Sequence, residues 1–144
     1  MMKVIFICTG NSCRSQMAEG IARERFGDSV IALSAGLRPE ENVHPLAVEV
    51  MKEIGIDISR QKPKIIDPDI LLQMDCVVTL CGDGEESCPA TPPSIKRVHM
   101  PVNDPSKSRG SEEEVAAAFR NARREVEEKV SAVISDLLEK NNQE

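Results

Sequence analysis

Cysteines and one arginine carry most of the chemistry that this sequence can perform. Cys8 and Arg14 are separated by five residues, in a polar segment that contains Gly10 and Ser15. The backbone N–H groups of such a loop, with the start of a following helix, can converge on one tetrahedral oxyanion, and arginine adds a planar pair of donors. The same positive potential favours the thiolate of Cys8, so this segment predicts a nucleophile beside an anion site.

The whole loop is expected to bind the oxyanion, through main-chain N–H groups and short polar side chains: Thr9, Gly10, Asn11, Ser12, Cys13, Arg14 and Ser15. Ser15 can donate a hydrogen bond to the sulfur of Cys8, and Gly10 is expected to permit the tight turn. Cys13 is expected to be a packed thiol at the helix start. The alternative, a structural Cys8 and a solvated Arg14, is disfavoured because a helix cap needs neither residue.

A second pair of thiols, Cys81 and Cys88, encloses a short acidic and glycine-rich segment. Zinc is disfavoured because the chain has no Cys-x-x-Cys cluster and only two histidines, His44 and His99. A redox relay fits better: Cys81 can attack an oxidised Cys8, and Cys88 can then form a disulfide with Cys81. The alternative is a pair of thiols without function. Composition predicts a mobile loop from Gly82 to Pro93.

Asp104, followed by Pro105, comes after the last expected strand. A carboxylic acid at that sheet edge can protonate an oxygen that leaves the Cys8 adduct, although an Asp-Pro pair is also common in simple turns. Cys76 begins an apolar run and is expected to belong to the core.

Apolar runs alternate with helical patterns along the chain. Strands are expected at 3–8, 30–34, 76–80 and 95–102. Helices are expected after the polar segment that ends at Ser15, with Gly27 as the C-terminal cap, at 44–53, at 67–74 and after the capping box of Ser111 and Glu114. The last helix should bury a stripe formed by Val115, Phe119, Ala122, Val126, Val130, Val133 and Leu137. Such alternation predicts a single α/β domain over residues 1–144, with a four-stranded parallel sheet and helices on both faces. Ligands bind at the carboxyl ends of such strands.

The composition excludes several classes of protein. The chain of 144 residues has a net charge of −6, which disfavours binding to nucleic acid. Its longest apolar run, residues 4–8, is too short for a membrane span or a signal peptide, so we expect a cytoplasmic protein. There is no Trp or Tyr and there are only three Phe, so aromatic walls are scarce.

Several segments together resemble a known family. They are CTGNSCRSQMAEG (8–20), SAG (34–36), MKEIGIDIS (51–59), VVTLCGD (77–83), CPATPP (88–93) and NDP (103–105). Nearly the whole chain thereby resembles the thioredoxin-coupled arsenate reductases, which share the fold of the low-molecular-weight protein tyrosine phosphatases. The arrangement of three thiols is specific to the reductases.

The resemblance implies a mechanism. Cys8 attacks arsenate held by the loop and Arg14, and Asp104 protonates the leaving hydroxide. Cys81 attacks the sulfur of Cys8 and releases arsenite, and Cys88 then takes over the disulfide, which thioredoxin reduces. Arsenate is then the substrate, with phosphate or sulfate as mimics. We also expect a monomer without a bound cofactor or metal.

Some members of this family hold a potassium ion near the loop. Three matching positions are Asn11, Glu19 and Ser34, but the fourth, an aspartate in those members, is Lys64 here. We expect the Lys64 ammonium to replace the ion, because two cations in one pocket would repel each other. The alternative is a solvated lysine beside Lys62. The segment before Asp104, aromatic in the family, reads His-Met-Pro-Val-Asn here.

Two other functions remain open at this stage. A tyrosine phosphatase acting on phosphate monoesters would use Cys8, Arg14 and Asp104 without Cys81 or Cys88, but it would want an aromatic wall for the phenol. A non-catalytic thiol protein would bind oxyanions or arsenite and show no turnover.

Overall fold

The computed structural model describes residues 1–80 and 88–142. Its elements follow in the order β1 (Met2–Cys8), α1 (Arg14–Phe26), β2 (Val30–Gly36), α2 (Pro45–Lys52), α3 (Pro68–Leu71), β3 (Cys76–Thr79), β4 (Lys96–His99), the 3-10 helix η1 (Pro105–Lys107) and α5 (Glu112–Asn142). Within this part of the chain, no helix is both long and apolar enough to cross a membrane.

The four strands form one parallel sheet in the order β2-β1-β3-β4. The sheet confirms the α/β fold expected from the alternating pattern. The chain leaves β1 toward β2 on one side and later returns to β3 on the other side. The carboxyl end of β1, where Cys8 lies, is therefore the topological switch point at which such sheets bind ligands.

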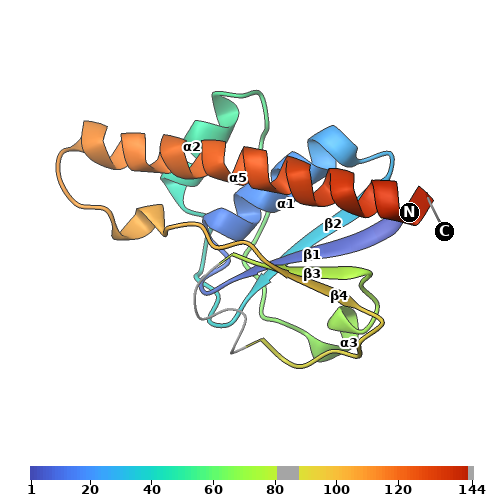
Figure 1. Cartoon of the computed structure of the whole chain (residues 1–144). Coiled ribbons are helices and arrows are strands. Elements are labelled where there is room, and N and C mark those ends of the chain that lie inside the picture. The colour runs from blue at the N-terminus through green and yellow to red at the C-terminus, as the bar shows by residue number, and fades with distance from the viewer. Residues whose placement is uncertain (81–87, 143–144) are drawn as a thin grey trace.

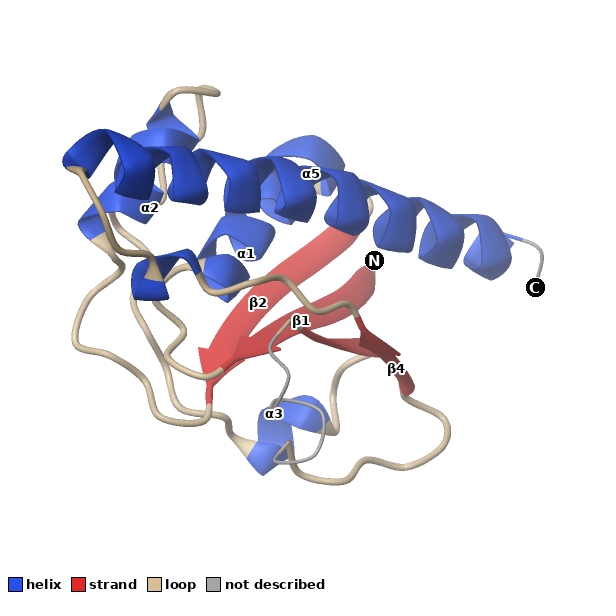
Figure 2. Cartoon of the chain, turned by 60° about the vertical axis from the view of Figure 1, so that its left-hand side comes forward, coloured by secondary structure: helices blue, strands red, loops and turns tan. Residues whose placement is uncertain are grey.

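Successive side chains of β1 point to opposite faces of the sheet and belong to two different hydrophobic clusters. Val4 and Phe6 belong to the cluster that α1 and α5 cover, while Ile5 and Ile7 belong to a smaller cluster with Leu71 of α3. Figures 1 and 2 show α5 and α1 on one face of the sheet and α3 on the other. Helices therefore cover both faces, as expected.

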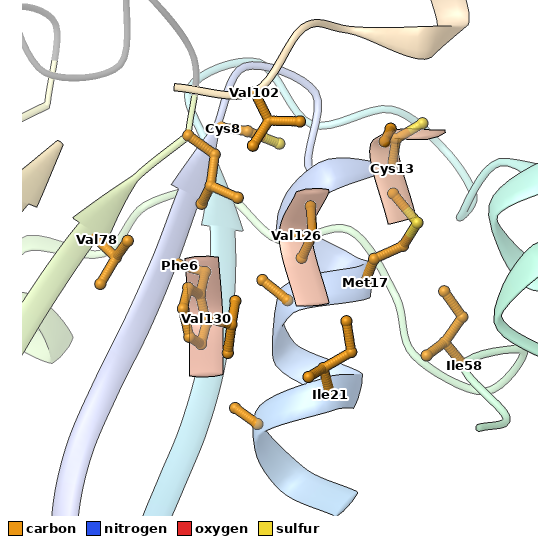
Figure 3. Packing of buried hydrophobic residues seen from close by; sticks show 14 of the residues in the cluster. Phe6, Cys8, Cys13, Met17, Ile21, Ile58, Val78, Val102, Val126 and Val130 are labelled. Carbon is orange, nitrogen blue, oxygen red and sulfur yellow. The ribbon is translucent and has the colours of Figure 1, made fainter. Parts of the chain in front are cut away.

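The helix α5 crosses the sheet and supplies much of the larger cluster. It begins with the capping box, in which the Glu114 N–H donates to Ser111 Oγ at 3.1 Å and the Ser111 N–H donates to Glu114 Oε1 at 3.4 Å. Figure 3 shows Val126 and Val130 of this helix in the same cluster of buried residues as Phe6. The buried stripe turns from Val130 to Ile134, so that Val133, expected in the stripe, is only half-buried.

Two elements are shorter than expected. The helix expected at 67–74 ends at Leu71, because Gln73 and Met74 donate to carbonyls three residues back and so form tighter turns. The strand expected at 95–102 spans only Lys96–His99. Pro101 has no N–H, but the N–H groups of Met100 and Val102 still bond to Thr79 O and Leu80 O, so the chain stays beside β3.

His44 links the sheet edge to α2. The Nδ1 atom of its ring accepts a hydrogen bond from the Leu46 N–H at 3.1 Å, and its backbone N–H donates to Ser12 O at 2.8 Å. The centroid of its ring lies 4.6 Å from that of Phe119. Burial lowers the pKa of His44, against a smaller opposing effect of the Asp104 carboxylate.

This histidine predicts a pH-dependent stability. A base whose pKa is lower in the folded chain binds protons preferentially in the unfolded chain, so the free energy of unfolding falls as the pH drops below about 6.5. Urea unfolding at about pH 7.5 and about pH 5.5 should show this loss. His44→Asn keeps a capping acceptor without a titrating ring and should lose less stability over this interval. An equal loss in both proteins would contradict the prediction.

Candidate active site

The loop between β1 and α1 directs its carbonyl groups outward. The N–H groups of residues 37, 38, 40 and 44 donate to the carbonyl oxygens of residues 8, 9, 10 and 12 at 2.8–3.3 Å. Asn11 O accepts from Gln16 Nε2, and Cys13 O accepts from the Met17 N–H. The N–H groups of residues 9–15 make no hydrogen bond to another described residue. The loop therefore offers a row of N–H donors to an anion.

Asn11, rather than Gly10, makes the sharp turn of this loop. Asn11 has a φ of 48°, in the left-handed region, which asparagine tolerates better than most residues. Its Nδ2 donates to Ser15 Oγ at 2.7 Å, and its Oδ1 accepts from the Lys64 N–H at 2.9 Å. The expectation that Gly10 permits the turn was therefore wrong. A Cβ at Gly10 would instead lie 3.1 Å from Cγ of Glu40.

Gly36, the last residue of the Ser-Ala-Gly segment, lets β2 approach the loop. A Cβ on Gly36 would lie 2.8 Å from Thr9 O and 2.9 Å from the Asn11 Cβ. A larger residue here would push the loop away from the sheet edge.

The sulfur of Cys8 lies at the base of the loop. Figure 3 shows Cys8 at the end of its strand, close to Val102. The side chain is buried, and Sγ lies 2.9 Å from Ser15 Oγ. Because Ser15 Oγ already accepts from Asn11, its own hydrogen is available to the sulfur, as expected from the sequence. Such a hydrogen bond stabilises a thiolate.

Arg14 is the first residue of α1, and its guanidinium is buried against the segment that follows β4. Nη1 donates to Val102 O at 3.0 Å, and Nη2 lies 3.6 Å from Asp104 Oδ2. The buried Nε has no hydrogen-bond partner among the described residues. The Nε–Nη2 edge is therefore the part of the fork that can bind an oxyanion.

Asp104 lies at the same sheet edge, as expected. Its Oδ1 accepts hydrogen bonds from Ser106, from N at 3.0 Å and from Oγ at 2.6 Å, while Oδ2 faces Arg14. Met100 and Val102 are buried, and their N–H groups bond to β3 and Leu80, so they anchor the segment that carries Asp104.

A pocket of about 440 Å³ opens above Cys8. Its described lining residues are all small, polar or charged, with no aromatic or aliphatic side chain: Cys8, Thr9, Gly10, Ser12, Arg14, Arg38, Glu40, Asp104, Ser106 and Lys107. This lining suits a small, highly charged anion better than an aryl group.

Residues 3–144 match the model of the family "Low molecular weight phosphotyrosine protein phosphatase". The chain belongs to this family. An arsenate reductase of Bacillus licheniformis is 51% identical over 127 residues, which are 88% of this chain and 91% of that protein. A solved arsenate reductase in the phosphate-binding state is 35% identical with a TM-score of 0.78, over 94% of this chain and 98% of that one. A thioredoxin-dependent arsenate reductase of Corynebacterium glutamicum is 29% identical with a TM-score of 0.67, over 92% of this chain and 63% of that one.

The four residues expected to match a potassium site lie close together. Ser34 Oγ donates to Glu19 Oε1 at 2.8 Å, and Lys64 Nζ lies 3.9 Å from the same oxygen. Asn11 joins the group through its hydrogen bond from the Lys64 backbone. The Lys64 ammonium also donates to Lys62 O at 2.8 Å. A cation thus already lies beside the buried Glu19 carboxylate.

The two thiols expected to be structural are buried in the folded chain. Burial, with a smaller effect of the Asp104 charge, raises the pKa of Cys13 to about 12. Burial likewise raises the pKa of Cys76 to about 11. Neither group forms an appreciable fraction of thiolate near neutral pH.

Cys88 lies on the other face of the sheet from Cys8. It is buried in the smaller cluster with Ile7, Leu71 and Val77, whereas Cys8 packs in the larger cluster. The segment after Cys88 is held by Arg97 Nη1, which donates to Pro89 O at 2.8 Å. Cys81 and residues 82–87 of the mobile loop expected from Gly82 to Pro93 lie outside the described residues.

Part of the site was not among the residues predicted from the sequence. Arg38, Glu40 and Lys107 line the pocket, and Val102 holds Arg14 through its carbonyl oxygen. A main-chain acceptor leaves no sequence signal. For the other three, the available signal was a charged residue within four positions after Gly36 or Pro105, at a sheet edge that binds ligands.

Thiol labelling tests the burial of Cys13 and Cys76. With iodoacetamide at about pH 7.5, both thiols should react far more slowly in the folded protein than in guanidinium chloride, because thiolate is the reacting form. Peptide mass spectrometry can follow each cysteine separately. Labelling of Cys13 in the folded protein as fast as in the unfolded chain would contradict its assignment as a packed, inert thiol.

Proposed function

We propose that the protein reduces arsenate to arsenite, with Cys8 as the nucleophile. The observation that carries this proposal is the buried Cys8 sulfur, hydrogen-bonded to Ser15, beneath a row of N–H donors and the Nε–Nη2 edge of Arg14. The named activity of the relatives, which are about half identical over most of the chain, supports the same substrate.

In the first step the Cys8 thiolate attacks the arsenic of an arsenate bound by residues 9–15 and Arg14. An As–O bond breaks, and the leaving hydroxide takes a proton and departs as water. Asp104 supplies that proton. Its Oδ2 is the suitable oxygen, because Ser106 occupies Oδ1 while Oδ2 faces Arg14 and hence the anion.

The second step transfers two electrons from sulfur to arsenic. The Cys81 thiolate attacks Sγ of Cys8, and the electron pair of the S–As bond goes to arsenic, which leaves as arsenite. The product is a Cys8–Cys81 disulfide. The Cys88 thiolate then attacks Cys81 and releases the Cys8 thiolate, so the oxidising equivalent ends as a Cys81–Cys88 disulfide.

The position of Cys88 supports a relay in which a third sulfur, that of Cys81, connects Cys8 with Cys88. The two side chains pack on opposite faces of the sheet, and β1 itself lies between their clusters. Cys81 follows Leu80, whose N–H bonds to Ile7 O one residue before Cys8. A relay through Cys81 can pass around this edge, while Cys88 must leave its apolar cluster to receive the disulfide.

We propose thioredoxin as the reductant, with no bound cofactor. The support is the thioredoxin dependence of the Corynebacterium glutamicum relative. Among the described residues, no group of three or more His, Cys, Asp or Glu side chains could hold a metal ion. We further propose a cytoplasmic monomer that binds phosphate and sulfate as mimics of arsenate.

Phosphatase action on small esters is the second candidate, because the family model is that of phosphatases. It would use the same attack by Cys8 and the same proton donor. The pocket offers no aromatic or aliphatic lining among its described residues, which disfavours phosphotyrosine. A thiol protein that only binds oxyanions or arsenite would need neither Asp104 nor turnover.

One assay separates these candidates. With thioredoxin, its reductase and NADPH, the wild type should consume NADPH only when arsenate is present. Cys8→Ser and Cys81→Ser should release no arsenite, and Cys88→Ser should release about one arsenite per chain and then stop, because the disulfide cannot leave Cys8. Cys76→Ser is the matched control and should retain turnover.

Sustained NADPH consumption by Cys88→Ser would overturn the relay. Hydrolysis of p-nitrophenyl phosphate without any arsenate-dependent NADPH consumption would favour the phosphatase. Stoichiometric binding of arsenite without turnover would favour the thiol-binding protein.

We also propose that the Lys64 ammonium takes the place of a potassium ion beside Glu19. The support is its 3.9 Å distance from the same Glu19 oxygen that accepts from Ser34. Unlike charges at this distance attract, and a second cation beside Lys64 would be repelled. The oxygens of Asn11, Glu19 and Ser34 would suit the ion only if the lysine were absent.

The variant Lys64→Asp tests whether the lysine takes the place of the ion, and the readout is thermal stability, not activity. The variant should gain about 4 °C in Tm when potassium chloride replaces choline chloride at about tenfold the dissociation constant, about 1.4 kcal/mol. The wild type should show no such difference. A potassium-dependent rise in the wild type that disappears in Lys64→Asp would refute the replacement.

A further inference from the structure

Two cations outside the loop line the pocket above Cys8. Arg38 belongs to the segment after β2, and Lys107 is the last residue of η1. Both are exposed at the mouth of the pocket. The chemistry proposed for Cys8, Arg14 and Asp104 uses neither of them.

The backbone of Arg38 is fixed against the loop. The Arg38 N–H donates to Thr9 O at 2.9 Å, and the N–H groups of Leu37 and Glu40 donate to Cys8 O at 3.3 Å and Gly10 O at 2.9 Å. The Arg38 side chain therefore extends from a backbone that is held beside the anion-binding N–H groups.

The backbone of Lys107 is held by Asp104. Its N–H donates to Asp104 O at 3.3 Å, and Asp104 caps η1 through the hydrogen bond from Ser106 N to Oδ1. The proton donor proposed above and the lysine thus belong to one small capped turn.

Neither cation is neutralised by an ion pair with another described residue. Among the residues that the structure describes, the pocket is lined by three cations, Arg14, Arg38 and Lys107, and by two carboxylates, Glu40 and Asp104. The whole chain, in contrast, carries a net charge of −6 and repels a dianion at long range. A local excess of positive charge in a pocket raises the local anion concentration.

We infer that Arg38 and Lys107 are specificity-determining residues that capture free dianionic tetrahedral oxyanions at the pocket mouth. This inference rests on the proposed function and deepens it. An unesterified dianion presents charged oxygens to both cations, whereas an ester turns an uncharged group toward them. The product arsenite is uncharged near neutral pH, so the same cations attract the substrate without retaining the product.

Phosphate binding, followed by calorimetry, tests the inference without any redox step. Arg38→Gln and Lys107→Gln should each weaken phosphate binding about 3- to 10-fold at low ionic strength, and less than about 2-fold at about 0.5 M salt. In the coupled assay the KM for arsenate should rise by the same factor with kcat unchanged. Arg38→Lys should retain most of the affinity.

Arg124→Gln is the matched control. Arg124 is exposed on α5 and does not line the pocket, so this variant changes the net charge equally and should bind phosphate as the wild type does. Equal affinity of the wild type, Arg38→Gln and Lys107→Gln would overturn the inference while the proposed function stands. Equal losses in Arg124→Gln would also overturn it, because the effect would then come from net charge.

The same experiments distinguish a failure of arsenate reduction from a failure of anion capture. If phosphate binds and weakens in the variants as expected, but arsenate drives no NADPH consumption by the wild type, anion capture holds and arsenate reduction does not. If the wild type binds neither phosphate nor arsenate, both are overturned. Circular dichroism of each variant confirms that the fold is intact.

Discussion

Four backbone N–H groups from residues 37–44 donate hydrogen bonds to four carbonyl groups of the loop between β1 and α1. The rest of the site depends on this arrangement. A loop whose carbonyl groups face outward must turn its N–H groups inward, because each peptide unit carries the two on opposite sides. The turn also requires the left-handed conformation of Asn11, whose side chain then supports Ser15 and, through it, the Cys8 sulfur. One backbone constraint thus produces both the anion site and the orientation of the nucleophile.

The sheet separates two of the three sulfurs in the proposed relay. Alternation along β1 directs Cys8 into the cluster under α1 and α5, while Cys88 packs under α3 on the other face. A third sulfur at the carboxyl edge is therefore a geometric requirement of the proposed relay. Burial keeps the remaining thiols, Cys13 and Cys76, protonated and out of this exchange.

Much of the fold and the centre of the site could be predicted from the sequence. The β-branched runs that become β1 and β3, the capping box at Ser111 and the spacing of Cys8 and Arg14 are local patterns with local physical causes. The left-handed Asn11, the carbonyl of Val102 that holds Arg14 and the approach of Arg38 depend on contacts between distant segments. Main-chain contacts of this kind leave no side-chain pattern, so only the folded chain reveals them.

In the proposed relay, Cys8, Cys81 and Cys88 pass one oxidising equivalent in that order. Mass-spectrometric mapping of disulfides after one equivalent of arsenate, without any reductant, tests it most directly. The wild type should carry a Cys81–Cys88 disulfide, and Cys88→Ser should carry a Cys8–Cys81 disulfide, each with one arsenite released. Arsenite released with all thiols intact, or a disulfide that contains Cys13 or Cys76, would contradict the claim.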